Sequence, residues 1–177
     1  MNAVADFVEA SDERLARAWA VLDTVLDPEV PVVSVRELGI LRDVRVNAEG
    51  LTVVLTPTYS GCPATELIER SVVDALMAAG LGPVQVQMQR APAWTTDWIT
   101  TEGRRKLREY GIAPPGPVDS SSGVTMRFMP RLKATALACP RCESANTERL
   151  SAFGSTACKA TYRCIACGEP FEHFKPI

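Results

Sequence analysis

The chain has 177 residues, 46% of them hydrophobic and 23% charged, which allows one ordinary domain or a domain of roughly 100 residues with a smaller module. The formal net charge of −2 gives no general attraction to nucleic acid or to an anionic membrane. No apolar run approaches the roughly 20 residues that span a bilayer, and the acids between Met1 and Ala10 do not fit a signal peptide, so we expect a cytoplasmic protein.

The first 110 residues or so carry alternating helical and strand-like periodicities. Ser11 is a candidate N-cap of the first helix, and Asn47–Gly50 is a good turn sequence between two strands. The predicted helices cover residues 12–26, 63–79 and 97–110, and the predicted strands cover 40–46, 51–56 and 84–89. This order predicts an α+β fold, a small mixed sheet with helices packed mainly on one face.

The segment Leu51–Gly80 presents a single thiol between a strand and a helix. If Pro63 is the first helical residue, Cys62 occupies the capping position, where backbone N–H groups and the helix dipole favour an anion. The thiolate is the form of cysteine that attacks electrophiles or binds metal. The alternative is a cysteine that only caps the helix.

Two acids, Asp27 and Glu29, lie in the loop after the first helix. The structural interpretation is that they cap and solvate the loop, as loop acids often do. The functional interpretation is a carboxylate pair that borders a pocket around Cys62. Both interpretations remain open at this point.

The plainest boundary in the sequence is a run of proline, serine and glycine. Ala113–Pro117 is stiff and extended, whereas Ser120–Gly123 is flexible. We therefore predict a first domain at 1–112, a linker at 113–123 and a second module at 124–177.

The second module carries two CxxC pairs. Their spacing is a strong signal for tetrahedral coordination by four sulfurs, from Cys139, Cys142, Cys164 and Cys167. Short strands predicted over 148–153 and 156–163 complete a zinc-ribbon pattern. A module of roughly 40 residues cannot build an adequate core, so the metal is expected to be structural. Iron in a rubredoxin-like site and disulfides are the alternatives to zinc.

Cys158 is left outside the two CxxC pairs. Most cysteines of this kind are small buried hydrophobic residues. The alternative is a redox role, in which Cys158 pairs with Cys62 across the linker. The single histidine, His173, lies between Phe171 and Phe174, and we expect it to be structural.

The residue inventory argues against self-contained catalysis. One histidine excludes a di-iron centre of the Glu-x-x-His type, and there is neither a dinucleotide fingerprint nor a P-loop. Three hypotheses remain: a metallocentre assembly protein that uses Cys62, a nucleic-acid-binding or protein-docking zinc ribbon, and a thiol enzyme without an evident base.

Three motifs of the first domain resemble one family. Asp27–Glu29, Leu38–Ile40 and Thr58–Pro63 are similar to the SufT-like domain of iron–sulfur assembly proteins, over about residues 12–112. In that family the cysteine that matches Cys62 is tied to cluster handling, and the acids that match Asp27 and Glu29 lie near it. The resemblance implies a transient iron–sulfur cluster, or iron, at Cys62.

The second module adds more specific motifs, Phe153–Ala160 and Glu169–Lys175, around the four cysteines. The whole chain resembles the family of small accessory subunits of bacterial phenylacetyl-CoA ring-epoxidases that are designated D or J. This resemblance implies a role in aerobic phenylacetate degradation. The implied partners are the other epoxidase subunits, which carry a di-iron site and a flavin/iron–sulfur reductase, and the implied task is the assembly or repair of their metal centres.

Overall fold

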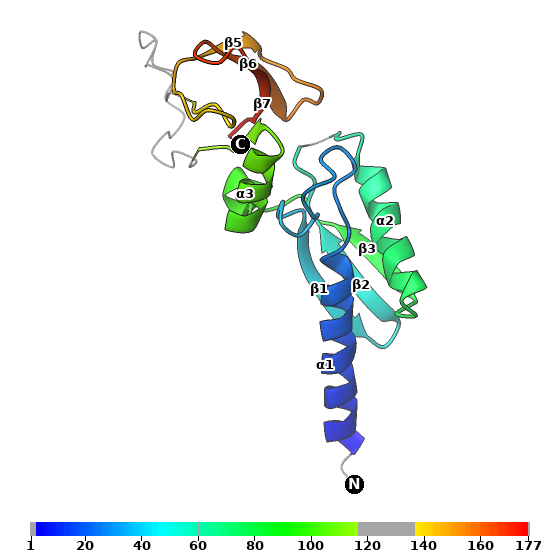
Figure 1. Ribbon diagram of the computed structural model, residues 1–177. Coiled ribbons are helices and arrows are strands. Elements are labelled where there is room, and N and C mark those ends of the chain that lie inside the picture. Colours follow the sequence, from blue (N-terminus) through cyan, green and yellow to red (C-terminus); the bar gives the residue numbers. More distant parts are fainter. Residues whose placement is uncertain (1–2, 60, 117–136, 177) are drawn as a thin grey trace. The chain divides into compact units, whose positions relative to one another are not determined.

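The computed structural model describes residues 3–59, 61–116 and 137–176, with side chains from Ser11 onward (Figure 1). Internal contacts divide the chain into two units, Met1–Trp94 and Thr95–Ile177, here called unit 1 and unit 2. Each unit has its own small sheet, so the α+β class predicted from the sequence is confirmed.

A three-stranded mixed sheet forms the centre of unit 1. Strand β1 (Leu41–Asn47) runs antiparallel to β2 (Gly50–Leu55), and β2 runs parallel to β3 (Val84–Met88). Gly50 has a φ of 134°, and a Cβ at this position would lie 2.2 Å from the carbonyl oxygen of Pro83. Glycine is therefore required where the β1–β2 turn closely approaches the start of β3.

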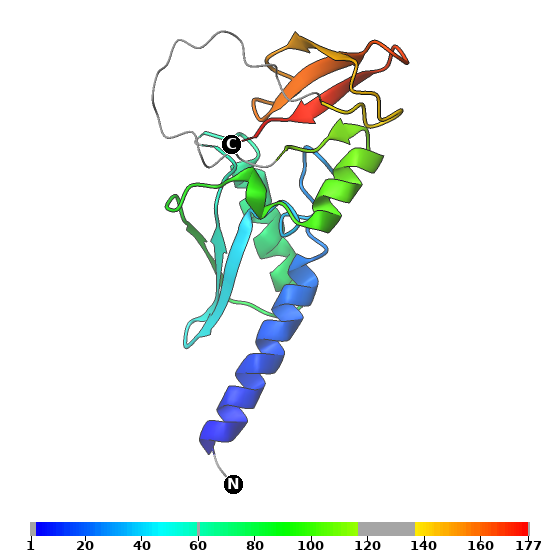
Figure 2. The same cartoon turned by 90° about the vertical axis from the view of Figure 1, so that its left-hand side faces the viewer.

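Two helices pack on one face of this sheet, as predicted (Figure 2). They are α1 (Ala3–Leu22) and α2 (Thr65–Ala78), which contact each other and also contact β1 and β3, respectively. Fully buried aliphatic side chains fill the space between the layers: Leu22, Leu51, Val53, Leu55, Val72 and Leu76. Each contributes on the order of 1.5–3 kcal/mol of burial free energy, which fixes the positions of the loops that leave the sheet.

The first helix begins earlier than the sequence predicted. Helix α1 starts at Ala3, so Ser11 lies inside the helix and is not its N-cap. Once a helix has formed, each further residue adds one backbone hydrogen bond. The segment before Ser11 contains several alanines, which favour helix, so the helix extends through it. In the described part of the chain no helix combines the length and apolarity needed to cross a membrane.

The second helix begins later than predicted. Helix α2 starts at Thr65 with Ala64 at the N-cap position, and no side chain caps it. The N–H of Thr65 donates to the carbonyl oxygen of Cys62 at 3.2 Å, which places Cys62 in a turn before the helix. The predicted capping position of Cys62 is therefore wrong. The residue before Cys62, Gly61, has a φ of 86°, so the chain changes direction there before the 62–65 turn and the helix.

Unit 2 contains a four-stranded sheet with the order β4-β7-β6-β5. Its strands are β4 (Ile112–Ala113), β5 (Thr147–Ser151), β6 (Lys159–Cys164) and β7 (Pro170–Phe174). The pairs β5–β6 and β6–β7 are antiparallel, whereas β4 runs parallel to β7. The predicted zinc-ribbon strands are confirmed as β5 and β6, but the sequence did not indicate β4 or β7.

The segment before β4 is helical. It forms a short 3₁₀ turn, η1 (Thr96–Trp98), and then α3 (Thr101–Glu109), whose first turn is capped by Thr100. The helix predicted over 97–110 is therefore two pieces with a cap between them. After α3, Gly111 adopts a φ of 94° and turns the chain directly into β4.

The internal contacts divide the two units after Trp94, whereas the predicted domain boundary at residue 112 stays a prediction. Ile112 and Ala113 pair with Glu172 and His173 of β7, and the backbone oxygen of Ala113 lies 3.2 Å from Nδ1 of the buried His173. These backbone hydrogen bonds join β4 to the sheet of unit 2. The segment from Thr95 to β4 is therefore grouped with unit 2, although the proline-rich composition begins only at Ala113. Residues 117–123 of the predicted linker lie outside the described residues.

Candidate metal centre and the Cys62 loop

The four CxxC cysteines form one compact cluster. Their Sγ atoms all lie within 4.8 Å of one another. The Sγ–Sγ distance is 3.9 Å between Cys139 and Cys167, and 3.5 Å between Cys142 and Cys164. A tetrahedral ion with metal–sulfur bonds of about 2.3 Å requires sulfurs roughly 3.8 Å apart. The residues therefore fit the metal site that their spacing predicted.

Both CxxC pairs lie in turns of the same geometry. In Cys139–Ser144 and in Cys164–Glu169, the first cysteine accepts from the N–H four residues later and donates to the carbonyl five residues later, at 2.9–3.0 Å. The residue after the second cysteine is left-handed in each case: Glu143 has a φ of 60° and Gly168 has a φ of 80°. This repeated turn directs both sulfurs of a pair to the same side.

The crowding of the four thiols makes their ionisation interdependent. The backbone N–H of Ser144 lowers the pKa of the Cys142 thiol, but the thiols of Cys164 and Cys167 outweigh it and raise this pKa to about 12. The backbone N–H of Cys167 lowers the pKa of Cys164 to about 7. Four thiolates this close repel one another unless a cation lies among them, so metal binding is expected to release protons.

The cluster is also part of the small core of unit 2. Cys139 and Cys164 are buried with Ala113 and Phe171, and Leu137 and Tyr162 pack against this group. Cys142 and Cys167 are exposed at the other side of the cluster. This group is one part of the buried interior of unit 2, which also contains Leu107, Ile112 and Phe174. A metal bound by the four sulfurs would join both CxxC turns to this interior.

Cys62 lies in the loop between β2 and α2, in unit 1. Its side chain is half-buried, and its N–H donates to the carbonyl oxygen of Tyr59 at 3.3 Å. Thr56, at the start of the same loop, is only 1% exposed, and its hydroxyl has no hydrogen-bond partner among the described residues. A buried hydroxyl without a partner destabilises the fold, and a functional role of the loop is one explanation for keeping it.

The structure does not bring Cys62, Asp27 and Glu29 together as a metal cluster. Among the described side chains, the four-cysteine site is the only group of three or more ligand-type residues close enough to share an ion. Cys62 therefore offers one sulfur, and a metal bound there would need its other ligands from elsewhere.

Asp27 has a clear structural role in unit 1. Its side chain is buried, and its Oδ1 accepts hydrogen bonds from the backbone N–H groups of Glu29 at 2.9 Å and Val30 at 2.8 Å. Asp27 therefore caps the loop after α1, as one interpretation predicted, and Glu29 takes part in this cap through its backbone. A direct role of either carboxylate at Cys62 stays a prediction.

We expect Asp27→Ala to lower the free energy of unfolding of unit 1 by about 1–3 kcal/mol, because two backbone donors lose their acceptor. Asp27→Asn keeps an oxygen acceptor and should cost less than half as much. Urea denaturation of the two variants, followed by circular dichroism, checks this. An equal loss in both variants would assign the effect to the negative charge and not to the cap.

Cys158 is a buried residue of unit 2, next to the start of β6. Its Sγ lies 3.0 Å from the hydroxyl oxygen of Thr156, and its carbonyl accepts from the N–H of Lys175. It is not part of the four-cysteine cluster. The alternative raised from the sequence, a redox pairing of Cys158 with Cys62 of unit 1, stays a hypothesis.

A buried ion pair beside Cys158 was not foreseen. Lys159 is 3% exposed, and its Nζ lies 2.7 Å from the Glu172 carboxylate, which also accepts from the N–H of Ser155 at 2.6 Å. Burial raises the pKa of Glu172, but the hydrogen bonds from Lys159 and Ser155 outweigh burial and lower it. No pattern in the sequence signalled this pair. Through Ser155 and Lys159, the Glu172 carboxylate connects the β5–β6 loop and the start of β6 to β7.

Two protein families match separate parts of the chain. Residues 15–88 match the family described as iron–sulfur cluster assembly protein, and this range includes Cys62. Residues 126–175 match the PaaD zinc beta ribbon domain, which includes all four clustered cysteines.

One solved structure supports the fold of the first unit. A crystal structure of a domain of unknown function, DUF59, from Bacillus anthracis superposes with a TM-score of 0.52 at 22% identity. It covers 56% of this chain and 96% of that chain. At this identity the match supports the fold alone.

Curated relatives extend the similarity to named proteins. A protein of Porphyromonas gingivalis (strain ATCC BAA-308 / W83) named Fe-S protein maturation auxiliary factor is 35% identical over 88 residues, which are 49% of this chain and 83% of that protein. A protein of Escherichia coli (strain K12), whose name assigns it to a 1,2-phenylacetyl-CoA epoxidase as one of the subunits, is 47% identical over 159 residues. This match covers 90% of the chain and 91% of the relative, and so the chain belongs to the PaaD family of 1,2-phenylacetyl-CoA epoxidase subunits.

Proposed function

We propose that the protein is an accessory maturation subunit of a phenylacetyl-CoA epoxidase. Its task is to help assemble or repair a metal centre of its partner subunits, and the favoured recipient is the iron–sulfur cluster of the reductase. The di-iron oxygenase subunit is the second recipient. The observation that carries the proposal is the similarity to an epoxidase subunit over 90% of the chain, in a chain whose residues 15–88 match an iron–sulfur assembly family.

Cys62 is the proposed site at which the cluster, or iron, is handled. Its single half-buried sulfur is a soft ligand, and it lies in the loop that follows β2, the central strand of the sheet. Iron–sulfur clusters are normally held by several thiolates, so a cluster on Cys62 keeps positions open for the sulfurs of a recipient. This arrangement suits transfer better than storage. Asp27 supports the site by holding the loop after α1 in shape.

The four-cysteine site holds a structural metal in this proposal, and we assign it as zinc. Tetrahedral coordination by four sulfurs suits zinc or iron, and zinc has no redox chemistry to interfere with cluster handling in the same chain. The matching family is described as a zinc beta ribbon, which supports zinc. The bound ion would fix both CxxC turns and, through Cys164 and Phe171, the core of unit 2.

A second candidate function is a zinc-ribbon adaptor that docks to proteins without transferring metal. The ribbon exposes Leu150 and Phe153, the latter 66% exposed, which favours a protein partner. Nucleic acid is less suitable, because basic residues of the ribbon are engaged by acids, in the pairs Arg141–Glu169, Lys159–Glu172 and Arg163–Glu148.

The proposal is tested by producing the epoxidase subunits with and without this protein. We expect the reductase to contain less iron and acid-labile sulfide when the protein is absent, and the assembled epoxidase to lose activity in proportion. The iron and acid-labile sulfide content of the purified reductase is measured in both preparations. A reductase with a full cluster in the absence of this protein would contradict the maturation role.

A further inference from the structure

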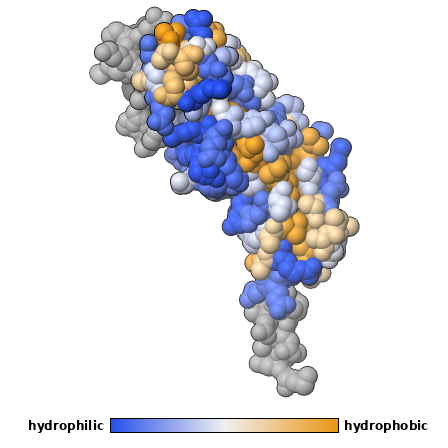
Figure 3. Space-filling model, viewed as in Figure 1, coloured by the Kyte–Doolittle hydropathy of each residue, from blue (hydrophilic) through white to orange (hydrophobic). Residues whose placement is uncertain are grey.

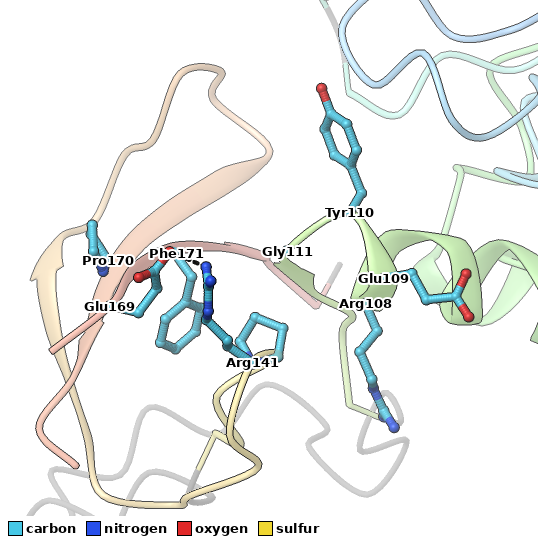
Figure 4. A pocket seen from close by; sticks show the side chains of 9 residues that line it. Arg108, Glu109, Tyr110, Gly111, Arg141, Glu169, Pro170 and Phe171 are labelled. Carbon is cyan, nitrogen blue, oxygen red and sulfur yellow. Dashed lines mark hydrogen bonds and ion pairs between the residues drawn. The ribbon is translucent and has the colours of Figure 1, made fainter. Parts of the chain in front are cut away.

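A depression of about 430 Å³ in unit 2 lies beside the end of α3, as Figure 4 shows. Its lining carries two arginines and two glutamates: Arg108, Arg141, Glu109 and Glu169. These charges balance, and Arg141 pairs with Glu169 at 3.0 Å, so the depression favours neither an anion nor a cation. The outer surface of α3 is strongly hydrophilic (Figure 3), and the described lining includes no thiol. Placement of the sulfur for cluster handling therefore depends on the loop that carries Cys62.

Two consecutive turns hold the backbone of Cys62. The N–H of Cys62 donates to the carbonyl oxygen of Tyr59 at 3.3 Å and closes a turn over residues 59–62. The carbonyl oxygen of Cys62 accepts from the N–H of Thr65 at 3.2 Å and closes a second turn over residues 62–65. Cys62 is thus the last residue of one turn and the first residue of the next, so a rotation of its backbone would disturb both hydrogen bonds.

Gly61 occupies the third position of the first turn, with a φ of 86°. A left-handed residue at this position of a turn is usually glycine or asparagine, because a Cβ crowds the backbone in this conformation. Among the described residues, a Cβ at Gly61 would meet no heavy atom within 4 Å beyond its chain neighbours. A side chain at this position therefore has room, and its cost lies in the backbone conformation alone.

Gly80 is a matched comparison after the other end of α2. It has a φ of 71°, and a Cβ there would also have room among the described residues. Its N–H donates to the carbonyl oxygen of Met77 at 3.0 Å, in the turn that ends the helix. Substitution by alanine should therefore strain the backbone similarly at both glycines, but only at Gly61 does the strain act on a turn that contains Cys62.

We propose that Gly61 is a positioning residue for Cys62, because its left-handed conformation closes the first turn and so fixes how the sulfur is presented to a recipient. The proposal rests on the function in cluster handling proposed for Cys62. A thiol held in one geometry loses little conformational freedom when a cluster or a recipient binds. An alanine disfavours the left-handed conformation about tenfold, so in Gly61→Ala the turn should open more often and the sulfur should lose this geometry.

The test compares Gly61→Ala, Gly61→Asn and Gly80→Ala in the full-length, zinc-loaded protein. The first readout is the rate at which iodoacetamide alkylates Cys62, measured by peptide mass spectrometry over a range of pH. The second readout is the iron and sulfide that each protein retains after anaerobic reconstitution. Urea denaturation shows whether the two alanine variants lose similar stability.

In Gly61→Ala we expect Cys62 to be alkylated roughly threefold faster or more at each pH, because the half-buried thiol becomes more accessible. The same variant should retain about threefold less iron and sulfide, or lower still. Gly80→Ala should shift the urea midpoint by a similar amount and match the wild type in both readouts. Gly61→Asn should lie closer to the wild type, since asparagine adopts the left-handed conformation more readily than alanine.

Wild-type alkylation of Cys62 in Gly61→Ala would overturn the proposal, and so would faster alkylation with unchanged retention of iron. Equal effects of Gly61→Ala and Gly80→Ala, or of Gly61→Ala and Gly61→Asn, would also overturn it. Alkylation does not require a bound cluster. A wild type that retains no iron and sulfide would therefore contradict the proposed function, while the alkylation rates would still decide the role of Gly61.

Discussion

Removal of the ribbon metal, by chelation or by Cys164→Ser, is expected to unfold unit 2 and to leave unit 1 folded. Binding of a structural zinc by four thiolates contributes on the order of 10–16 kcal/mol in small modules. Cys139 and Cys164 themselves belong to the buried cluster with Ala113 and Phe171, so loss of the metal removes the link between the CxxC turns and this cluster. Unit 1 has its own sheet and its own buried core, so we expect it to stay folded without the metal.

The structure also indicates which residues before the ribbon should unfold with it. Because β4 is held by β7 and α3 leads directly into β4, the segment Thr95–Ala113 should lose protection together with the ribbon. Hydrogen exchange measured by mass spectrometry resolves this segment. If it stayed protected in the metal-free protein, the division at residue 112 suggested by composition would be correct.

Cys158→Ser is the matched control for Cys164→Ser. Cys158 is buried, as the ligands Cys139 and Cys164 are, but it is not part of the four-sulfur cluster, so this variant should keep its metal and the protection of unit 2. Retention of a tightly bound ion by Cys164→Ser would contradict the ligand assignment.

Cys62→Ser is expected to fold normally and to fail in supporting epoxidase activity. The substitution is small and the side chain is half-buried in a loop, so the effect on stability should be within about 0.5 kcal/mol. A hydroxyl is a poor ligand for iron compared with a thiolate, so cluster handling should fall at least tenfold.

Complementation of a deletion strain measures this effect, with growth on phenylacetate as the readout. Cys158→Ser is the comparison: it should complement like the wild type if Cys158 is only a buried hydrophobic residue, and it should fail to complement if Cys158 pairs with Cys62. Full complementation by Cys62→Ser would favour the adaptor function, in which the protein docks to partners without transferring metal.

The elements with strong local periodicity were predictable from the sequence. In β3, Val84–Met88, apolar and polar residues alternate, because one face of the strand is more buried than the other. In α2 the apolar residues recur about every 3.6 residues, because one side of the helix is buried. The four-cysteine site was equally predictable, because each CxxC pair is a local turn that aims two sulfurs at one ion.

Features that depend on distant residues were not predictable. The pairing of Ile112 and Ala113 with β7 joins segments 60 residues apart in a strand only 2 residues long, and no local pattern marks it. The buried pair of Lys159 with Glu172 likewise joins residues of different strands, β6 and β7. Such pairings follow from tertiary contacts.

The most direct test of the central claim is anaerobic reconstitution of the wild type and of Cys62→Ser with iron and sulfide, followed by metal analysis and visible spectroscopy. The wild type should retain iron and sulfide with the absorbance of an iron–sulfur cluster, in addition to one zinc in the four-cysteine site, and Cys62→Ser should retain the zinc alone. Equal iron and sulfide in both proteins, or zinc alone in both, would contradict a role for Cys62 in cluster handling.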